Sequence, residues 1–366
     1  MLHAKSRAPV LLLYNYYKSW SAEEAQEARR HAGYMVECLE AIGHPVRIVE
    51  FWKDVTEVMK RFDPAKWIVF NWCEGVEDEV GGDARVCADL EAMGFTYTGN
   101  PPAALRLSVE KGRAKRLLQR WGIPTPVGRE FKSADDVAAW DHFPAIVKPV
   151  SQHCSAGVTR DAVAHDLRSL RQRVAYVNET FKEAALVEQF VDGREINVGV
   201  WGNGRPRVLP LREIDFSAIE NPFHRMVTWD SKWVPTSVDW NAMPVITEVQ
   251  ASDELRARIE RIVLDTYRVF GCRDYARVDL RIDRQGRPYV VDVNPNPDIT
   301  ADGGFIGACR AAGYSYGEAV SNIIQMAVAR RNRRQALFTM MQQRRLAAQP
   351  AALQGAALQP VALTGG

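Results

Sequence analysis

Two apolar strand segments on either side of residue 285 constrain the fold more than any other part of the sequence. They are ARVDLRID (276–283) and RPYVVDVN (287–294). The Gln285-Gly286 pair between them predicts a tight antiparallel hairpin. Alternate residues of a strand share a face, so Asp292 and Asn294 lie together, and Asp279 can join them from the neighbouring strand.

Three oxygen-bearing side chains on one rigid face suit Mg²⁺, a hard cation that keeps waters and takes further ligands from substrate phosphates. The alternative is a solvated hairpin face, since alternating charge is common on exposed strands. Apolar residues flank the polar ones on the second strand: Val290, Val291 and Val293. We therefore favour a Mg²⁺ site, with Mn²⁺ as the other ion that such ligands accept.

The first hundred residues alternate between strand and helix. Apolar strand segments are expected at 9–14 (PVLLLY), 46–51 (VRIVEF) and 67–71 (WIVFN). A helix begins with a capping box at Ser21 and Glu24, and another spans about 83–93. This order predicts a parallel α/β layer with right-handed crossovers.

Length and pattern together predict three domains, because about 150 residues per domain gives two or three for 366 residues. We expect an N-terminal α/β domain at 1–104, a central α+β module at 105–204, a C-terminal α+β domain with the metal hairpin at 205–330, and a disordered tail at 331–366. Within the central module, ALVEQFV and REINVGVWG read as strands joined by a hairpin turn at Asp192-Gly193. The tail is rich in Ala, Gln, Pro and Leu and has no amphipathic pattern.

The net charge of +2 has a local origin. No Asp or Glu follows Glu318, but six arginines do. Removing these six from the 47 basic residues leaves 41 against 45 acidic ones, so the body of the chain is faintly acidic. The basic tail is therefore no evidence for a nucleic-acid-binding fold, and we expect no nucleic-acid partner.

Cysteine spacing and apolar runs indicate a compartment. The six cysteines show no CxxC spacing, which suits reduced thiols in a cytosol. The longest early apolar run, 10–13, is too short for a signal-peptide core, and nothing approaches a transmembrane span. We expect a cytoplasmic protein with no membrane partner.

Two lysines are candidates for binding phosphate. Lys148 ends an apolar strand, and Pro149 and the small-residue loop 151–157 (SQHCSAG) follow it. A lysine beside such a loop can hold a polyphosphate as a point charge while loop amides donate further bonds. Neither Lys148 nor Lys111 is specific alone, and no Walker A or GxGxxG motif occurs.

Taken together, the motifs resemble those of the ATP-grasp enzymes and, more closely, of the D-alanine–D-alanine ligase group. The resemblance rests on EKGRAKRLLQRWGIPTP (110–126), AIVKP (145–149), LVEQFVDGREINVGVWG (186–202), RVDLRIDRQGRPYVVDVNPNPD (277–298), FNWCEG (70–75) and MGFTYTGN (93–100). It runs from about residue 10 to 330, in order and with the spacing of the group. As a set these motifs are specific, and they imply a three-domain ATP-grasp fold.

The resemblance implies a role for each matched residue. Lys111 and Lys148 match lysines that contact ATP phosphates, Glu188 the acidic residue at the adenine hinge, Glu195 the one that binds the ribose hydroxyls, and Asp279, Asp292 and Asn294 the Mg²⁺ ligands. Arg277 matches the arginine that stabilises the tetrahedral oxyanion. Lys232 falls where the group has a lysine in the lid over the γ-phosphate.

The activity implied is that of an ADP-forming carboxylate–amine ligase. A carboxylate attacks the γ-phosphate of ATP to give an acyl phosphate, and an amine then displaces phosphate through a tetrahedral oxyanion. The protein supplies positioning, Mg²⁺ and fixed positive charge. The partners are small-molecule carboxylates and amines, amino acids or small peptides above all. A homodimer is also implied, although no residue of the sequence shows it.

The donor side of the substrate site departs from the group. NYYKSWSAEE (15–24) replaces the N-terminal loop with its His-Glu signature. Cys154, with Ser155 after it, stands in place of a loop serine, and Trp233 in place of the lid tyrosine. A thiol bonds weakly and an indole only donates, so the Glu–Ser–Tyr set that orients the first D-alanine cannot form. Loop neighbours seldom meet productively, so we do not expect Cys154 to act as a nucleophile with His153.

The acceptor side departs as well. Asp298 and Gly303 stand where the group has a Gly and a Ser that receive the second substrate's carboxylate, and Asp302 is adjacent. An aspartate repels a carboxylate at close range. We therefore expect an amine that is presented differently, either cationic or larger. Asp for Glu at position 292 keeps the charge, so metal binding should survive.

Two other functions stay open. One is strict D-alanine–D-alanine synthesis for peptidoglycan, which the substitutions at 154, 233, 298 and 303 disfavour. The other is a nucleotide-binding protein without catalysis, against which the complete set of matched charged residues argues. Six aromatic residues line an apolar pocket or pack in the core and lid: Tyr14, Tyr16, Tyr17, Trp20, Trp229 and Trp233.

Overall fold

The computed structural model describes residues 7–347 except 78, 153, 154, 235 and 241. It divides into two units, residues 1–327 and 328–366. The described residues of the first unit form three sheets, each with its own apolar core. None of the helices in the described segments is long and apolar enough to cross a bilayer.

The N-terminal sheet is parallel, with strand order β2-β1-β3-β4. Its elements are β1 (Val10–Asn15), α1 (Ala22–Ala41), β2 (Val46–Phe51), α2 (Val55–Met59), β3 (Ile68–Trp72), α3 (Gly82–Ala92) and β4 (Thr96–Tyr97). The predicted capping box starts α1: the Ser21 hydroxyl accepts from the Glu24 amide, and the Glu24 carboxylate accepts from the Ser21 amide. The predicted strand–helix alternation is confirmed.

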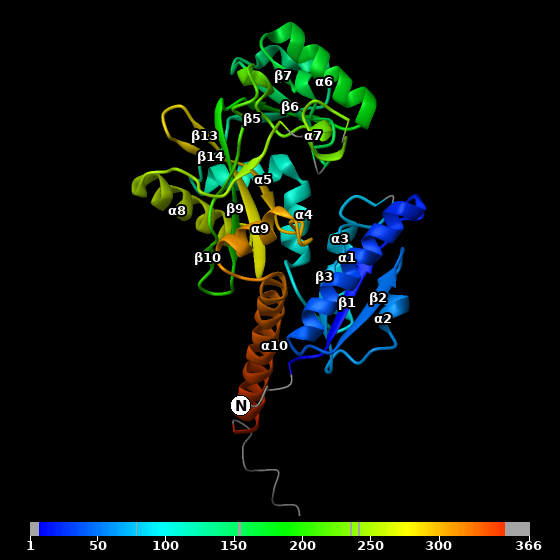
Figure 1. The fold of residues 1–366 in the computed structure, drawn as a ribbon. Coiled ribbons are helices and arrows are strands. Elements are labelled where there is room, and N and C mark those ends of the chain that lie inside the picture. The colour runs from blue at the N-terminus through cyan, green and yellow to red at the C-terminus, as the bar shows by residue number, and fades with distance from the viewer. Residues whose placement is uncertain (1–6, 78, 153–154, 235, 241, 348–366) are drawn as a thin grey trace, which may run out of the picture. The chain divides into compact units, whose positions relative to one another are not determined.

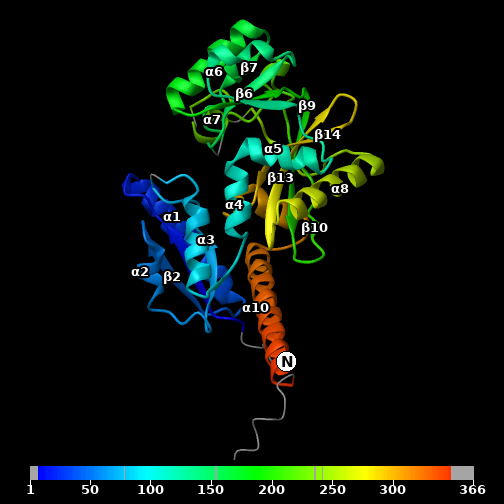
Figure 2. The ribbon, with the colours of Figure 1, turned by 180° about the vertical axis from the view of Figure 1, so that it is seen from behind.

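Two helices and an antiparallel sheet follow. The helices are α4 (Pro102–Val109) and α5 (Lys111–Arg120). The sheet has the order β5-β8-β6-β7, with β5 (Gly128–Phe131), β6 (Ala145–Pro149), β7 (Val163–Ala164) and β8 (Ala185–Gln189). It is accompanied by the 3-10 turns η1 (Ala134–Ala139) and η2 (Arg160–Ala162) and by α6 (Leu167–Phe181). Helix α6 packs against this sheet, as both views show (Figure 1 and Figure 2).

The C-terminal sheet has the order β12-β11-β9-β13-β14, and β10 pairs with β9. Its strands are β9 (Gly193–Trp201), β10 (Arg207–Val208), β11 (Arg212–Ile214), β12 (Val245–Ile246), β13 (Tyr275–Asp283) and β14 (Pro288–Asn294). Its helices are η3 (Pro222–His224), α7 (Trp229–Trp233), α8 (Asp253–Val269), α9 (Gly304–Ala311) and α10 (Tyr316–Ala347), the last of which continues into the second unit.

The predicted hairpin at Asp192-Gly193 is wrong. Strand β8 belongs to the central sheet, whereas β9 pairs with β11 and β13. A β-carbon on Gly193 would lie 1.9 Å from the Ile282 carbonyl oxygen, so the chain passes from one sheet to the other at a close backbone approach. Strand alternation is the same in either sheet, so the sequence did not distinguish them.

The predicted disordered tail also needs correction. Helix α10 continues to Ala347, and residues 348–366 lie outside the described part of the chain. Residues 331–347 contain Arg, Gln, Ala, Leu and Met but neither Gly nor Pro, and these residue types have high helix propensity. The lack of an amphipathic stripe was therefore a poor guide to disorder in this segment.

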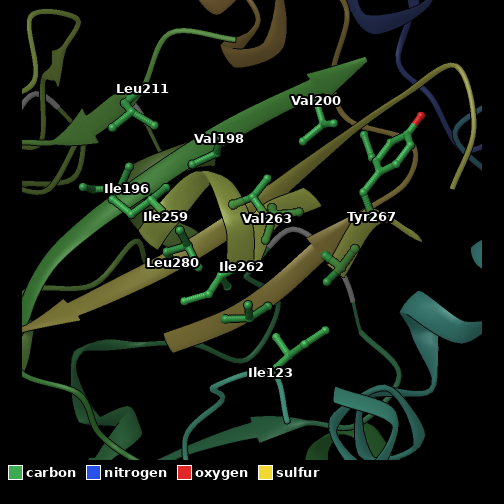
Figure 3. Close-up of a cluster of buried hydrophobic side chains, with 14 of the residues drawn as sticks. Ile123, Ile196, Val198, Val200, Leu211, Ile259, Ile262, Val263, Tyr267 and Leu280 are labelled. Carbon is green, nitrogen blue, oxygen red and sulfur yellow. The ribbon is translucent and has the colours of Figure 1, made fainter. Parts of the chain in front are cut away.

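The core of the C-terminal domain lies between α8 and one face of the sheet (Figure 3). Alternate residues of each strand contribute to it: Ile196, Val198 and Val200 from β9, and Val278, Leu280 and Ile282 from β13. The intervening residues therefore point to the opposite face. Burial of the apolar set selects the register of these strands.

We expect Ile259→Ala, in α8, to reduce the free energy of unfolding by about 2–5 kcal/mol, because it removes buried methyl groups and leaves a cavity. Ile259 is fully buried, whereas Ile246 in β12 is 37% exposed and serves as the matched control. Urea unfolding of both alanine variants measures the difference. Equal losses would contradict the assigned core.

Candidate active site

The polar face of the C-terminal sheet brings the predicted metal ligands together. Across the predicted hairpin, Asp279 pairs with Asp292 and Arg277 pairs with Asn294. A bulge between Asp279 and Leu280 leaves Val291 unopposed, which keeps Asp292 on the same face as Asp279. The arrangement expected from the two strand segments is observed.

Asp279 is the most heavily bonded carboxylate of this face. Arg277 donates to both of its oxygens, from Nε at 2.8 Å and from Nη2 at 2.9 Å. Asn197 and Asn294 each donate from Nδ2, at 2.9 and 3.0 Å. Burial alone would lower the pKa of Arg277, but the charge of Asp279 outweighs it and raises the pKa. The pair is held in a fixed bidentate geometry.

The donor set fits a hard divalent cation. Two carboxylates and a side-chain amide supply oxygen ligands within one strand pair, and the Asp292 carboxylate accepts the Val293 amide at 3.0 Å. No group of three or more His, Cys, Asp or Glu suited to a metal occurs among the described residues. A metal at Asp279 and Asp292 would therefore complete its shell with waters or substrate oxygens, as Mg²⁺ does.

A buried carboxylate links two lysines in the central sheet. Glu188 on β8 lies 2.5 Å from Lys115 Nζ and 2.6 Å from Lys148 Nζ. Burial would raise the pKa of Glu188, but the two ammonium groups lower it to about 2. Burial would likewise lower the pKa of Lys148, and Glu188 raises it. The predicted contact of Glu188 with adenine stays a prediction, since its carboxylate is paired with both lysines in this structure.

Lys111 lies at the first residue of α5 and reaches the loop after β6. Its ammonium group donates to the Val150 carbonyl at 3.4 Å and to the Gln152 carbonyl. Burial lowers the pKa of Lys111, and the charge of Asp292 opposes that effect. This lysine is therefore held near both the loop and the Asp292 carboxylate of β14.

Glu183 fixes the start of that loop. Its carboxylate accepts the Ser151 amide at 2.8 Å, the Ser151 hydroxyl at 2.5 Å and the Gln152 side-chain amide at 3.0 Å. Ser155 has a positive φ of 63°, and its carbonyl accepts from the Val158 amide at 2.9 Å. Cys154 lies outside the described residues, so its predicted place in the substrate pocket stays a prediction.

Glu195 on β9 is paired with an arginine that the sequence reasoning did not single out. Arg281 on β13 stands opposite Glu195 and donates to it from Nη1 at 3.2 Å. Its guanidinium lies over the rings of Phe190 and Phe216, 5.5 and 5.4 Å from their centroids. Burial raises the pKa of Glu195, which Arg281 partly offsets. The predicted ribose ligand thus has a fixed neighbour.

The predicted lid residues Lys232 and Trp233 lie on α7. The side chain of Trp233 is 54% exposed and lies 5.9 Å from Trp229, ring centroid to ring centroid. The Trp229 amide donates to the Val158 carbonyl at 3.0 Å, so this short helix adjoins the loop after β6. Lys232 is exposed, and its charge lowers the pKa of Glu195 against the effect of burial. Of the remaining aromatic candidates, Tyr14 is buried within β1.

Asp298 and Gly303 occupy the N-terminal end of α9. The Asp298 carboxylate accepts from the amide and the hydroxyl of Thr300, both at 2.8 Å. A β-carbon on Gly303 would lie 2.9 Å from the Asp298 carbonyl oxygen and 2.9 Å from its Oδ2. The aspartate therefore fills the space that a serine side chain would need at position 303.

Three further residues of the site were missed by sequence reasoning. Asn197 follows Glu195 by two residues on β9, so strand alternation predicts it on the same face. Lys115 follows Lys111 by one helical turn. Arg281 follows Asp279 by two residues on β13, as Asp279 follows Arg277, so strand alternation predicts all three on the same face. Their partners lie on strands distant in sequence, which is why the contacts themselves were not predicted.

Comparisons with known proteins find relatives of this chain. The family model described as "D-ala D-ala ligase C-terminus" matches residues 125–325. The chain is 33% identical to the uncharacterized protein y4sG of Sinorhizobium fredii over 81% of this chain and 87% of that one. It is 29% identical to the D-alanine–D-alanine ligase of Desulforudis audaxviator over 83% of this chain and 94% of that one.

Solved structures share the fold. The D-alanine–D-alanine ligase of Bacillus anthracis complexed with ATP superposes with a TM-score of 0.69 at 22% identity, over 90% of this chain and all of that one. The VanG D-Ala:D-Ser ligase of Enterococcus faecalis gives a TM-score of 0.68 at 17% identity, over 88% of this chain and all of that one.

We expect Glu188→Gln to lower the free energy of unfolding at pH 7 by about 3–5 kcal/mol, because two buried ammonium groups lose their counter-ion. The folded pKa of about 2 lies below the ordinary 4.5, so this stability is present above pH 4.5 and is lost as pH falls towards 2. The gap between wild type and variant should therefore narrow on acidification.

Urea unfolding at a series of pH values from 7 to 3 measures this gap. Glu130→Gln, on the neighbouring strand β5, is the matched control, since Glu130 is exposed. Its substitution should change stability by no more than about 0.5 kcal/mol. A pH-independent gap for Glu188→Gln would contradict the buried ion-pair assignment.

Proposed function

The chain belongs to the D-alanine–D-alanine ligase family of ATP-grasp enzymes, and from that premise we propose that it joins a carboxylate to an amine through an acyl phosphate. Its class is that of an ADP-forming ATP-grasp ligase. The observation that carries the proposal is the charged face of β9, β13 and β14, where Arg277, Asp279, Asp292 and Asn294 meet.

The nucleotide in this proposal is ATP, and its phosphates are held by lysines. Lys111 reaches the loop after β6 from α5, and Lys148 stands near the end of β6, just before that loop. Loop amides and point charges of this kind bind polyphosphates. In this proposal Glu195, to which Arg281 donates a hydrogen bond, accepts from the ribose hydroxyls. Lys232 on α7 is the lid cation for the γ-phosphate.

The metal in this proposal is Mg²⁺, with Mn²⁺ as the alternative, and Asp279, Asp292 and Asn294 would hold it. When bound, such an ion neutralises charge on transferring phosphoryl oxygens. The other charged residues of the site contribute through the positions of their charges. The lysines bind phosphate, and Arg277 carries a permanent positive charge beside the metal ligands. No side-chain nucleophile is required.

The chemical sequence has two steps. A carboxylate oxygen of the first substrate attacks the γ-phosphorus of ATP, the bond to ADP breaks, and an acyl phosphate forms. The amine then adds to the acyl carbon, and the Arg277 guanidinium stabilises the tetrahedral oxyanion. Phosphate leaves as the amide bond forms and the nitrogen loses its proton. Charges that are already fixed in position stabilise such a transition state, because the groups of the site do not have to reorganise during the reaction.

The acceptor in this proposal is an amine that is presented differently from D-alanine. The N-terminal end of α9 already carries the Asp298 carboxylate, whose Oδ2 excludes a side chain at Gly303. A carboxylate directed to the same place would be repelled. D-alanine–D-alanine synthesis is therefore the alternative that this geometry disfavours.

A phosphate-release screen of paired carboxylates and amines tests the proposed reaction. We expect ATP- and Mg²⁺-dependent release with an amino acid or small peptide as donor, and little release with D-alanine as both substrates. Robust turnover on D-alanine alone would contradict the acceptor assignment. ATP binding without ADP formation across the whole panel would favour a non-catalytic nucleotide-binding protein.

We expect Arg277→Ala to reduce turnover by at least about a hundredfold, the effect of removing an oxyanion-stabilising group, while ATP binding stays largely intact. Steady-state phosphate release and calorimetric titration with an ATP analogue measure the two quantities. Arg284→Ala is the control, because that arginine is 71% exposed on the hairpin turn. Equal loss of turnover and ATP affinity would contradict the role assigned to Arg277.

A further inference from the structure

A second arginine lies on the charged face, and the proposed reaction leaves it without a role. Arg212 on β11 pairs with Asn197 on β9, Asn197 with Asp279 on β13, and Asp279 with Asp292 on β14. Residues that pair directly across neighbouring strands present their side chains on the same face. Arg212 is thus the end member of the row that contains both aspartates of the predicted metal site.

Helix α9 is shaped to receive the Arg212 side chain. Its Nη1 donates to the Gly304 carbonyl at 2.8 Å. A β-carbon on Gly307, one turn further along α9, would lie 1.4 Å from the same nitrogen, so only glycine leaves room for the guanidinium there. A β-carbon on Gly304 would lie 3.9 Å from Arg277 Nη1. The two arginines therefore converge on Gly304.

The charges of these arginines are balanced differently. Arg277 has Asp279 as a bidentate partner. Within the residues that the structure describes, Arg212 forms no ion pair with a carboxylate, and its neighbours include a third cation, Arg310. Partial burial lowers the pKa of Arg212, and Arg310 and Arg277 lower it further. The row thus ends in a half-buried positive charge that has no counter-ion in the described part of the chain.

An anionic ligand would balance this charge. Nη1 is occupied by Gly304, and the planar fork of a guanidinium retains donors that match a carboxylate. The N-terminal end of α9 cannot serve the same ligand, because the Asp298 carboxylate fills the space next to Gly303. On the basis of the proposed function, we propose that Arg212 binds a carboxylate carried by the amine substrate and so determines acceptor specificity.

Arg212 could instead serve only to attach α9 to the sheet through the Gly304 carbonyl. The two roles predict different losses. A specificity role affects the affinity for carboxylate-bearing amines alone, whereas an attachment role disturbs Arg277 and the nucleotide as well, since Arg277 lies against the same glycine.

Binding measurements that need no turnover test the inference. The full-length protein is loaded with ADP and Mg²⁺ and titrated calorimetrically with matched amines that differ only in the carboxylate: alanine, β-alanine and 4-aminobutyrate against their amides. We expect at least one acid to bind wild type about ten- to a hundredfold more tightly than its amide, the range for a charge-assisted hydrogen bond. Arg212→Gln should abolish this preference, and Arg212→Lys should keep part of it.

Arg207→Gln is the matched control, an exposed arginine on β10, which also pairs with β9. It should preserve both the acid preference and the affinity for ADP. The inference is overturned if wild type binds acids and amides equally or binds none of these amines. It is also overturned if Arg212→Gln weakens ADP binding as much as acid binding.

A phosphate-release assay with the same amines separates this inference from the proposed function. An acid preference that depends on Arg212, without phosphate release for any donor paired with these amines, supports the anion site and counts against the ligase reaction. Phosphate release with equal use of acid and amide supports the ligase reaction and overturns the role of Arg212.

Discussion

The site depends on the burial of one apolar sheet face beneath α8. Val198, Val278 and their neighbours must point to that helix, which leaves Asn197, Arg277 and Asp279 on the other face. A slip of one residue would exchange the two sets and place charges in the core. Hydrophobic packing, which takes no part in the chemistry, thus fixes where the charged groups stand.

Local pattern predicted the elements well and their long-range pairing poorly. The hairpin at Gln285-Gly286 was predicted because its turn and alternation are local, and the bulge at Asp279 preserved the expected face. Strand β9 was assigned to the wrong sheet, since alternation does not identify a partner strand. The helix after residue 330 was missed because its propensity is intrinsic and leaves no amphipathic mark.

The same distinction applies to the site. Family motifs identified residues that carry charge, such as Lys148 and Glu188, but not what neutralises them. Lys115 and Arg281 were missed, although each pairs with a predicted residue. Arg212 was also missed, although its charge lies near the predicted Arg277. A buried charge needs a counter-charge, yet the sequence does not say which of 92 charged residues supplies it. That answer requires the fold.

The buried carboxylate of β8 has a consequence for how the protein accommodates a polyanion. Glu188 has two ammonium partners where one would satisfy its charge. If Lys148 binds a phosphate, as proposed, Glu188 keeps Lys115, whose ammonium group donates to the Pro126 carbonyl at 2.6 Å. Lys148 would then pair with the phosphate in place of Glu188. Glu188 would still have Lys115 as a counter-ion, so no charge would be left unpaired in the protein interior.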